Sequence, residues 1–444
     1  MPYFSSMGCS GVDLPTLMSY LEEAISEFPD RRTGRNTRYE MRDAALAAFS
    51  VFFTQSPSFL SHQRSMQLSK GKSNAGTIFG VNDIPTDNHI RSLLDPVDSS
   101  LVQPVFRKVF KALEQRKALD ELRCFDQTLL VALDGVWFHN SETVHCTQCN
   151  TQQHNDGRTT YYHSAVTPVI VSPGNSRVIS LEPQFIKPQD GAKKQDCENA
   201  AGKRWLRGAG LSYVEQGVTI LGDDLYCNQP MCELLLEHHY NFILTCKYTS
   251  HKNLAEWIEQ ADAKLDLNEH FKKHWDGKQR LTWRYRFANG VPIRDSEDAL
   301  RVNWMELVIF DADGKQRARH VFATNHVLTR ENVAAYIDAG RARWKIENEH
   351  NNTLKTKGYN LEHNFGHGNK NLSNLLLSLN LLAFLFHTML ELYDRRYQLI
   401  RKTLPRRDRF FNDVKALTQY MLFESWEALM LFMLKGLDLE DPGG

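Results

Sequence analysis

The sequence has little that would place it in a specialised class of protein. Its 444 residues include 53 Lys+Arg and 53 Asp+Glu, so neither charge is in excess. With 24% charged residues and no net charge, it is not a disordered polyelectrolyte. Its 25 glycines and 15 prolines are too few for a collagen-like or low-complexity chain. A globular protein of about two to four domains is expected at this length.

Membrane and secretion signals are also scarce. The one long uncharged stretch, Asn371 to Leu390, contains polar side chains that a lipid-facing helix would leave without partners. We expect a buried amphipathic helix there and no membrane contact. The N-terminus lacks a basic region followed by an apolar one, and the eight cysteines are scattered. Free thiols in a reducing cytoplasm are expected.

Helical periodicity marks both ends of the chain, over residues 1–125 and 371–444. Each end has a basic cluster that is either a DNA contact or a solvated face. The cluster residues are Arg31, Arg32, Arg35, Arg38 and Arg42 in the first region, and Arg406 and Arg407 in the last.

The middle of the chain is rich in β-strand patterns. Residues 126–250 predict the order β-β-β-α-β-α-β, with a hairpin turn at 172–175. Residues 251–330 predict a polar helix over 253–275, and then strands separated by turns at Asn289-Gly290 and Asp313-Gly314. Residues 331–357 predict one helix.

Carboxylates follow two of the apolar strand patterns. Asp134 comes after LLVAL, and Asp223 and Asp224 come after VTILG. Carboxylates held at the ends of buried strands suit Mg²⁺, which prefers oxygen ligands. The alternative is an Asx turn or a helix N-cap, for which Asp is a favoured residue.

A third carboxylate lies in the helix predicted over 331–357. Arg343 and Glu347 are four residues apart and share a helix face, so the arginine can orient the carboxylate or bind a phosphate beside it. The alternative is a surface salt bridge of well under ~1 kcal/mol. Trp344 and Ile346 indicate that part of this helix is buried.

These three motifs, in this order, resemble the DDE transposases of bacterial insertion sequences. The resemblance is to the hairpin-forming group marked by Y-x2-R-x3-E-x6-K, and it extends over residues 45–390. It implies that Asp134, Asp223 and Glu347 are the catalytic carboxylates, with Arg343 and Lys355 as further catalytic residues. In two departures from the motif, Gly340 occupies the Tyr position and Lys355 is one residue late.

The resemblance implies an α/β RNase H-like catalytic core with a β-rich insertion, flanked by helical N- and C-terminal regions. The expected parts are a helical DNA-binding domain (1–125), the first part of the core (126–250), the insertion (251–330), the part of the core with the third carboxylate (331–370) and a helical C-terminal region (371–444).

The implied activity is cleavage of the ends of an insertion sequence and their joining to target DNA. Two Mg²⁺ ions ~4 Å apart would be held by Asp134, Asp223 and Glu347. Terminal inverted repeats and target DNA would be the partners, with a homodimer on paired ends in the cytoplasm, at the nucleoid. Two alternatives stay open: a metal-dependent nuclease of the same fold without strand transfer, and a catalytically silent DNA-binding relic.

Further cations lie near these motifs. Lys193, Lys194 and Arg204 would bind phosphates near the scissile bond, or they are solvated loop charges.

Zn²⁺ is a second metal that the sequence suggests. Cys146 and Cys149 form a CxxC pair, followed by His154 and His163. This spacing is not that of a standard zinc finger, and a pair of buried thiols in a β connection is the alternative.

Overall fold

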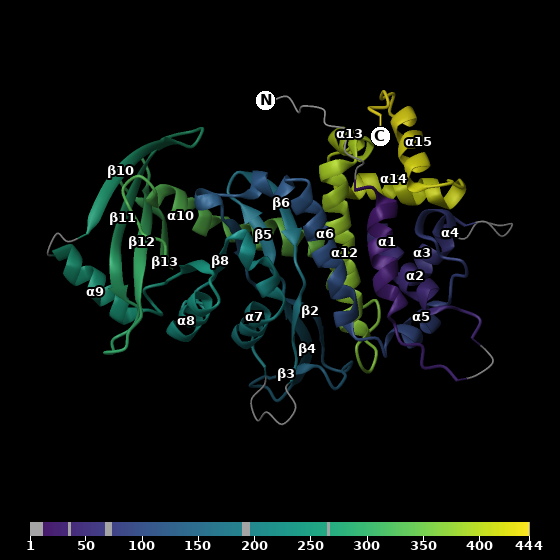
Figure 1. The fold of residues 1–444 in the computed structure, drawn as a ribbon, viewed down its shortest axis with the longest axis horizontal. Coiled ribbons are helices and arrows are strands. Elements are labelled where there is room, and N and C mark those ends of the chain that lie inside the picture. The colour runs from purple at the N-terminus through teal and green to yellow at the C-terminus, as the bar shows by residue number, and fades with distance from the viewer. Residues whose placement is uncertain (1–11, 34–36, 67–72, 189–195, 264–266, 444) are drawn as a thin grey trace. The chain divides into compact units, whose positions relative to one another are not determined.

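The chain has a mixed α/β fold (Figure 1). The computed structural model describes residues 12–33, 37–66, 73–188, 196–263 and 267–443. Contacts divide the chain into two compact units. The helical unit comprises Met1–Leu113, Trp137–His163 and Asn352–Gly444, and the sheet unit comprises Glu114–Val136 and Ser164–Asn351.

The unit boundaries differ from the predicted domain ranges. Trp137–His163 lies within the predicted core range 126–250 but belongs to the helical unit. The predicted range 331–370 is divided after Asn351. Contacts between segments far apart in sequence set these boundaries, and local sequence patterns do not report such contacts.

The helical unit is built from both ends of the chain and a small β segment. Its helices are α1 (Leu14–Ser26), α2 (Met41–Phe53), α3 (Phe59–Met66), α4 (Asn74–Phe79), α5 (Asp87–Leu94), most of α6 (Gln103–Gln115), α11 (Asn352–Thr356), α12 (Leu372–Tyr393), α13 (Arg395–Thr403), α14 (Arg407–Tyr420) and α15 (Trp426–Gly436). Its strand segments come from β2 (Gly135–Ser141), β3 (Asn150–Gln153) and β4 (Thr159–Val166).

Helix α12 forms the core of this unit. Every residue from Asn374 to Leu390 is buried, so the expectation of a buried helix is confirmed, whereas the expectation of an amphipathic one was wrong, because no face of this stretch is exposed. Phe49 of α2 packs against Phe386, with ring centroids 5.2 Å apart. By length and composition α12 could span a membrane, but 89% of its apolar window is buried inside the protein.

The polar residues of α12 have partners within the helical unit. Asn380 donates a hydrogen bond to the Tyr359 carbonyl at 2.9 Å, and His387 is 2.6 Å from the Tyr359 hydroxyl. These contacts explain how a helix with polar side chains is buried, because each hydrogen bond offsets the cost of removing a polar group from water.

The sheet unit contains a nine-stranded sheet in the order β10-β11-β12-β13-β9-β8-β1-β5-β6. The strands are β1 (Leu129–Ala132), β5 (Val169–Ser172), β6 (Asn175–Ser180), β8 (Val218–Gly222), β9 (Asn241–Thr245), β10 (Asn268–Trp275), β11 (Arg280–Pro292), β12 (Arg301–Phe310) and β13 (Gln316–Thr324), and the short β7 (Gln184–Ile186) pairs with β4. The helices are α7 (Glu198–Arg207), α8 (Gln229–Glu237), α9 (Lys252–Ala263) and α10 (Val333–Ala342).

Strands β1, β8 and β9 are parallel to one another, and the other neighbours in the sheet are antiparallel. Every residue of β1 and β8 is buried. Strands that are covered on both faces need continuous apolar runs, which LLVA and VTILG provide. The predicted hairpin turn at 172–175 is confirmed, since Ser172 pairs with Asn175 between β5 and β6.

Four local predictions were wrong. Within residues 126–250, seven strands, β1 to β7, precede α7, where three were predicted, because the sequence pattern did not separate the short strands. The helix expected over 253–275 ends at Ala263, and β10 follows it. Asn289-Gly290 is an irregularity inside β11, where the pairing with β12 shifts register between Ala288 and Val291, rather than a turn between strands. The helix expected over 331–357 is interrupted, because a π-helix over Ile346–Asn351 separates α10 from α11.

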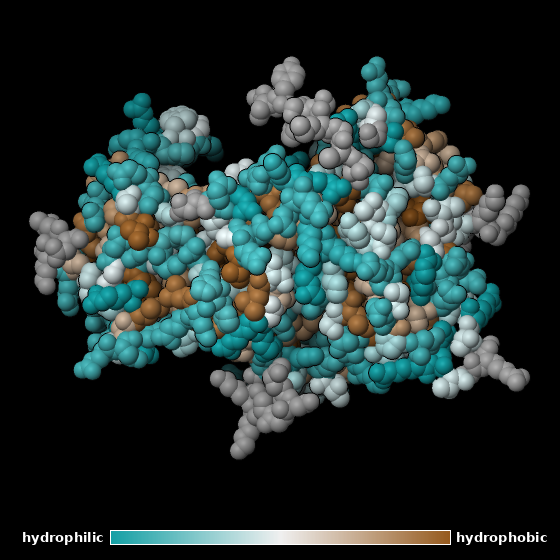
Figure 2. Space-filling model, in the orientation of Figure 1, coloured by the Kyte–Doolittle hydropathy of each residue, from teal (hydrophilic) through white to brown (hydrophobic). Residues whose placement is uncertain are grey.

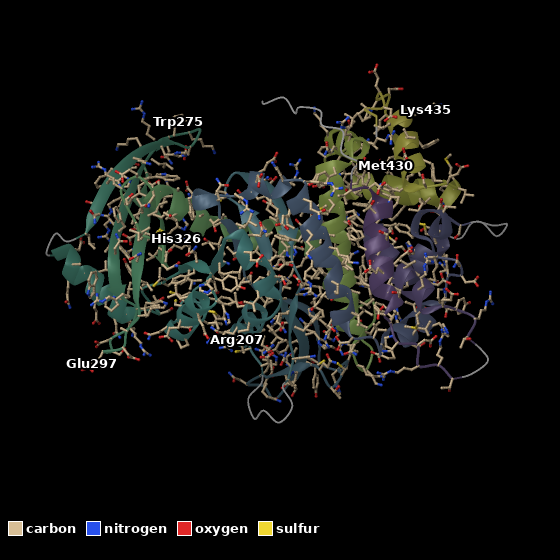
Figure 3. The ribbon with its side chains drawn as sticks, in the orientation of Figure 1. Arg207, Trp275, Glu297, His326, Met430 and Lys435 are labelled. Carbon is tan, nitrogen blue, oxygen red and sulfur yellow. The ribbon has the colours of Figure 1, made fainter. Side chains whose placement is uncertain are left out.

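The sheet ends at β10, an exposed strand. Phe271 and Trp275 are 58% and 61% exposed, and Figure 3 labels Trp275 at the end of this strand. Lys272 and Lys273 lie between them, and charged side chains on an edge strand oppose pairing with a second chain. On the face drawn in Figure 2, hydrophilic residues predominate, with smaller hydrophobic patches among them.

Candidate active site

Asp134 and Asp223 follow neighbouring parallel strands in the sheet unit. Ala132 of β1 pairs with Leu221 of β8, and the Leu133 amide donates to the Leu221 carbonyl at 2.9 Å. The carboxyl ends of parallel strands meet at one edge of a sheet, where ligands of open α/β sheets commonly bind. The backbones of Asp134 and Asp223 therefore both lie at this edge of the sheet.

Asp134 is surrounded by other carboxylates. The pKa of Asp134 is raised to about 7, first by burial and then by the charges of Glu198, Glu347 and Asp223, while the charge of Arg343 lowers it. The three carboxylates predicted from the sequence are therefore close enough to affect one another. Their oxygens are not among the described ligand groups whose atoms all lie within 4.8 Å. This wider spacing is compatible with a site for two ions ~4 Å apart, because the ligands of two ions extend over more space than those of one.

Glu347 lies in the π-helix that follows α10. Arg343 Nη2 donates to Glu347 Oε1 at 2.8 Å, and the Arg343 side chain is 18% exposed against 41% for Glu347. In the part of the chain that the structure describes, Nη1 of Arg343 is buried without a hydrogen-bond partner. Single π-turns inside helices are rare and occur frequently at functional sites.

The neighbours of Glu347 differ in exposure. Ile346 is fully buried, which confirms that part of this segment is buried, whereas Trp344 is 61% exposed and does not contribute to that burial. A single tryptophan between charged residues does not reveal from the sequence which way it points.

Glu198 is a fourth carboxylate that the sequence reasoning missed. It is the first residue of α7, and a Cβ at Gly135 would overlap its carboxylate. Burial raises the pKa of Glu198, and the charge of Asp223 adds to this effect. An acidic residue in the first turn of a helix is common for electrostatic reasons alone, so the sequence offered no distinct signal.

Tyr226 is a buried tyrosine beside this group of acids. Its side chain is fully buried, and its ring lies against Gly202 of α7, where a Cβ would come within 2.7 Å of Cε1. Burial raises the pKa of Tyr226 well above its usual range, and the charge of Glu198 adds to this. Tyr226 is therefore a neutral hydroxyl next to the Glu198 carboxylate.

Asp223 and Asp224 point to different surroundings. Asp223 interacts with Asp134 and Glu198, and its Oδ1 also accepts from the Leu225 amide at 2.9 Å, as in an Asx turn. Asp224 accepts from the Lys247 amide at 2.6 Å and lies 3.4 Å from His251 Nε2. Only Asp223 belongs to the group around Asp134.

Asp224 and His251 adjoin a second cluster. Cys227, Cys246 and His251 have ligand atoms within 4.8 Å of one another. The contact with Cys227 lowers the pKa of Cys246 to about 6, with help from His251 and against the effect of burial. An open cavity of ≈ 420 Å³ lies beside Cys227 and His251.

Lys355, the last residue of the predicted catalytic set, lies in α11 of the helical unit. Its Nζ forms an ion pair with Glu362 at 2.8 Å. The five predicted catalytic residues are therefore divided between the units, with four of them in the sheet unit.

The N-terminal arginines lie mainly outside helices, between the end of α1 and the start of α2. Two of them have acidic partners, Arg32 with Asp30 at 2.6 Å and Arg42 with Glu22 at 2.7 Å. Arg31 and Arg38 are exposed, and Arg35 lies outside the described residues. The structure therefore presents most of the described part of this basic cluster on the segment that connects α1 and α2.

The other predicted DNA-binding residues also differ in their surroundings. Arg204 forms an ion pair with the buried Asp196 at 2.6 Å and also donates to the Phe185 carbonyl. Arg407 is bound to Glu391 and the Tyr359 hydroxyl, while Arg406 is 78% exposed and pairs with Asp408. Lys193 and Lys194 lie outside the described residues.

The CxxC pair belongs to a cluster in the helical unit. Cys146, Cys149, His163 and His367 have ligand atoms that all lie within 4.8 Å of one another. His154 is not in this cluster, because its Nε2 is 2.8 Å from the Thr160 hydroxyl. His367 takes its place, and no spacing rule could have indicated a residue so far along the chain.

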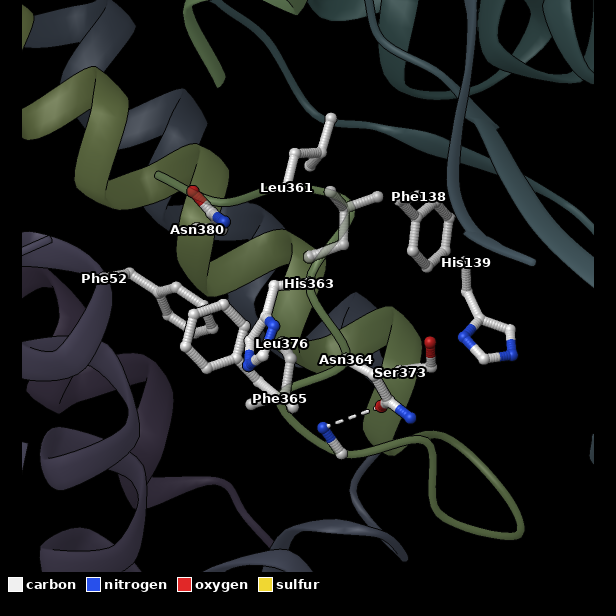
Figure 4. Close-up of a pocket in the computed structure, with 12 residues that line it drawn as sticks. Phe52, Phe138, His139, Leu361, His363, Asn364, Phe365, Ser373, Leu376 and Asn380 are labelled. Atoms are coloured by element: carbon white, nitrogen blue, oxygen red, sulfur yellow. Dashed lines mark hydrogen bonds between the residues drawn. The ribbon is translucent and has the colours of Figure 1, made fainter. Parts of the chain in front are cut away.

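A small pocket adjoins this cluster (Figure 4). Phe138 and His139 line it together with residues of the loop before α12 and of α12 itself. Its cavity volume is ≈ 30 Å³, about the space of one water molecule.

Comparison with models of protein families and with curated proteins finds no match for this chain.

Proposed function

We propose that this chain is a DNA transposase of the DDE type, with an RNase H-like catalytic core. The main support is that the charges of Asp223, Glu347 and Glu198 all raise the pKa of Asp134. These four residues come from separate segments of the sheet unit. The central strands support the fold proposal, because the acids follow two of the three neighbouring parallel strands, β1, β8 and β9, and antiparallel strands extend this group on both sides.

Mg²⁺ fits this group of residues. Among the described residues, the charges that act most strongly on Asp134 are three acids and one arginine, so the site has excess negative charge, and carboxylate oxygens are ligands that Mg²⁺ prefers. Asp134, Asp223 and Glu347 would hold the metal. Two such ions, when bound, supply activation of water or of a DNA 3′-OH and stabilisation of the leaving oxygen.

The chain's own residues position these ligands. Strands β1 and β8 hold two of the acids at one sheet edge, and Arg343 fixes the direction of Glu347 through its 2.8 Å hydrogen bond. Exposed cations such as Arg31 and Arg38 are suited to bind the DNA backbone, which is recognised largely through phosphate contacts. A homodimer on paired transposon ends is part of the proposal.

A cleavage and joining assay tests the proposal. The purified chain would be incubated with Mg²⁺, a duplex containing the DNA that flanks its reading frame, where the proposal expects short inverted repeats, and a target plasmid. We expect cleavage at the repeat ends and joined products, both abolished by Asp134→Asn and Glu347→Gln and retained by Asp224→Asn. Cleavage without joining would favour a nuclease, and the absence of both with bound DNA would favour a silent DNA-binding protein.

A further inference from the structure

Two thiols and two imidazoles converge at one point in the helical unit. The Sγ atoms of Cys146 and Cys149 are 3.9 Å apart, and His163 Nε2 is 3.4 Å from each of them. His367 Nε2 is 3.5 Å from Cys149 Sγ. Three of the four residues are buried, and Cys146 is partly exposed.

These distances are those of the edges of a coordination tetrahedron. With Zn–S bonds of ≈ 2.3 Å and Zn–N bonds of ≈ 2.0–2.1 Å, tetrahedral angles place two sulfurs ~3.8 Å apart and a sulfur ~3.6 Å from a nitrogen. The observed separations agree with both values to within about 0.2 Å.

The backbone supports the thiolate form of both cysteines. The Cys146 amide is 3.3 Å from Cys149 Sγ, and the Gln148 amide is 3.4 Å from Cys146 Sγ. Amide N–H groups that point at sulfur stabilise negative charge on it, and the thiolate is the form that binds metal.

The alternatives account for less of this arrangement. A disulfide needs an S–S distance of about 2.05 Å, and it would leave both imidazoles without a reason to face the sulfurs. A simple pair of buried thiols likewise does not explain two histidines that each direct Nε2 at them. Two sulfur and two nitrogen ligands in a tetrahedron are typical of Zn²⁺.

We propose that Cys146, Cys149, His163 and His367 bind one structural Zn²⁺ ion. All four positions are filled by protein ligands, which is characteristic of structural and not catalytic zinc sites. The site is independent of the proposed magnesium site, since it shares no residue with it and lies in the other unit.

The ion would connect parts of the helical unit that are far apart in sequence. Cys146, Cys149 and His163 belong to the segment Trp137–His163, whereas His367 lies in the loop that leads into α12. Gln148 reinforces this connection, because its side chain bonds to Asn371 at 2.7 Å and to Asn374 at 2.8 Å. Metal binding would thus stabilise the attachment of the β segment to the start of the core helix.

Elemental analysis of the full-length protein tests the proposal directly. We expect about one zinc ion per chain when the protein is expressed in zinc-supplemented medium and purified without chelators. Replacement of the zinc by Co²⁺ should give the visible absorption of a tetrahedral site with thiolate ligands. Wild-type protein that contains no zinc and takes up neither metal would overturn the proposal, whatever the variants do.

Variants then identify the ligands. Cys149→Ser and His367→Gln should each weaken zinc binding by more than the 10–100-fold typical of losing a supporting residue. His154→Gln is the matched control and should keep one zinc, as should Asp134→Asn. Zinc retained by His367→Gln but lost from His154→Gln would refute the ligand set. If a ligand variant does not fold, a competition titration of folded wild-type protein with a chromogenic chelator gives the affinity instead.

Discussion

Glu198 contributes more than any other charge to the raised pKa of Asp134, although the two residues come from different segments of the sheet unit. The absence of a side chain at Gly135 allows this approach, since a Cβ there would overlap the Glu198 carboxylate. The charged form of the proposed catalytic carboxylate is therefore disfavoured in the metal-free protein, and a bound cation would favour it. This relationship makes the stability of the metal-free protein dependent on pH.

Asp134→Asn should raise the free energy of unfolding of the Mg²⁺-free protein at neutral pH and change it little in acid. A carboxyl group whose pKa rises on folding, here from 3.8 to about 7, stabilises the protein below pH 3.8 and loses that contribution as pH rises towards 7. The gain in unfolding free energy over wild type should therefore grow from pH 4 to pH 7 by about 2–4 kcal/mol. Urea unfolding at several pH values measures it.

Glu198→Gln provides the matched comparison. It removes the charge that raises the pKa of Asp134 most, but it leaves Asp134 in place. Its gain in unfolding free energy over wild type should therefore also grow with pH, but by a smaller amount. A gain that is equal at pH 4 and pH 8 in both variants would show that Asp134 does not titrate between them.

Asp223→Asn and Asp224→Asn should have opposite outcomes in DNA cleavage. Asp223 interacts with Asp134, whereas Asp224 accepts from the Lys247 amide and lies near His251. We expect Asp223→Asn to slow cleavage at least about 100-fold, which corresponds to about 2.7 kcal/mol of barrier. Asp224→Asn keeps an acceptor for the amide and should stay within a few-fold of wild type. Equal losses in both variants would contradict the assignment.

His62→Gln should reduce the loss of stability in acid. His62 is buried among Ser50, Thr54 and Ser56, and burial lowers its pKa to about 3. A histidine whose pKa falls on folding stabilises the protein above pH 6.5 and loses that contribution as pH falls towards 3. Between pH 7 and pH 4 the wild type should lose about 3 kcal/mol through this residue, and the variant should not.

The control for His62 is His239→Asn. His239 is exposed, and its left-handed backbone conformation (φ 62°) is one that asparagine adopts readily. Denaturant midpoints of both variants and of wild type at pH 7 and pH 4 give the comparison. An acid slope that is unchanged in His62→Gln would mean that this imidazole becomes charged without cost.

The sequence was most informative where a local pattern determines the structure. Continuous apolar runs identified β1 and β8, because a strand buried on both faces needs such a run. An acid directly after each run then indicated Asp134 and Asp223, since neighbouring parallel strands place their carboxyl ends together. The i, i+4 spacing likewise indicated the hydrogen bond between Arg343 and Glu347.

Residues joined only by the tertiary fold could not be found in this way. Glu198 and His367 have no local spacing to the residues that they approach, and their residue types are common at ordinary positions. The surroundings of Arg407 and Arg204 also depend on distant partners, Glu391 with Tyr359 in one case and the buried Asp196 in the other. Their role in ion pairs therefore did not emerge from the density of basic residues.

The π-helix at Glu347 illustrates a third limit. Side-chain periodicity distinguishes helix from strand, but a single wider turn changes the register of the residues after it by only one position. The offset of Lys355 from the transposase motif is also one residue. Spacing rules taken from regular helices do not resolve a difference of that size.

Replacing Arg31 and Arg38 together by alanine should weaken binding to transposon-end DNA. Both are exposed, while Arg32 and Arg42 in the same segment already have acidic partners. Each lost phosphate contact reduces the magnitude of the slope of log K against log salt by about 0.9. The slope of the double variant should therefore be smaller than that of wild type by up to about 2. Fluorescence anisotropy at several salt concentrations measures the slope. Lys111→Ala, an exposed cation on α6, is the control and should leave it unchanged. If the double variant binds with wild-type affinity and slope, the cluster is a solvated face, and the exposed Arg406 is the next residue to replace.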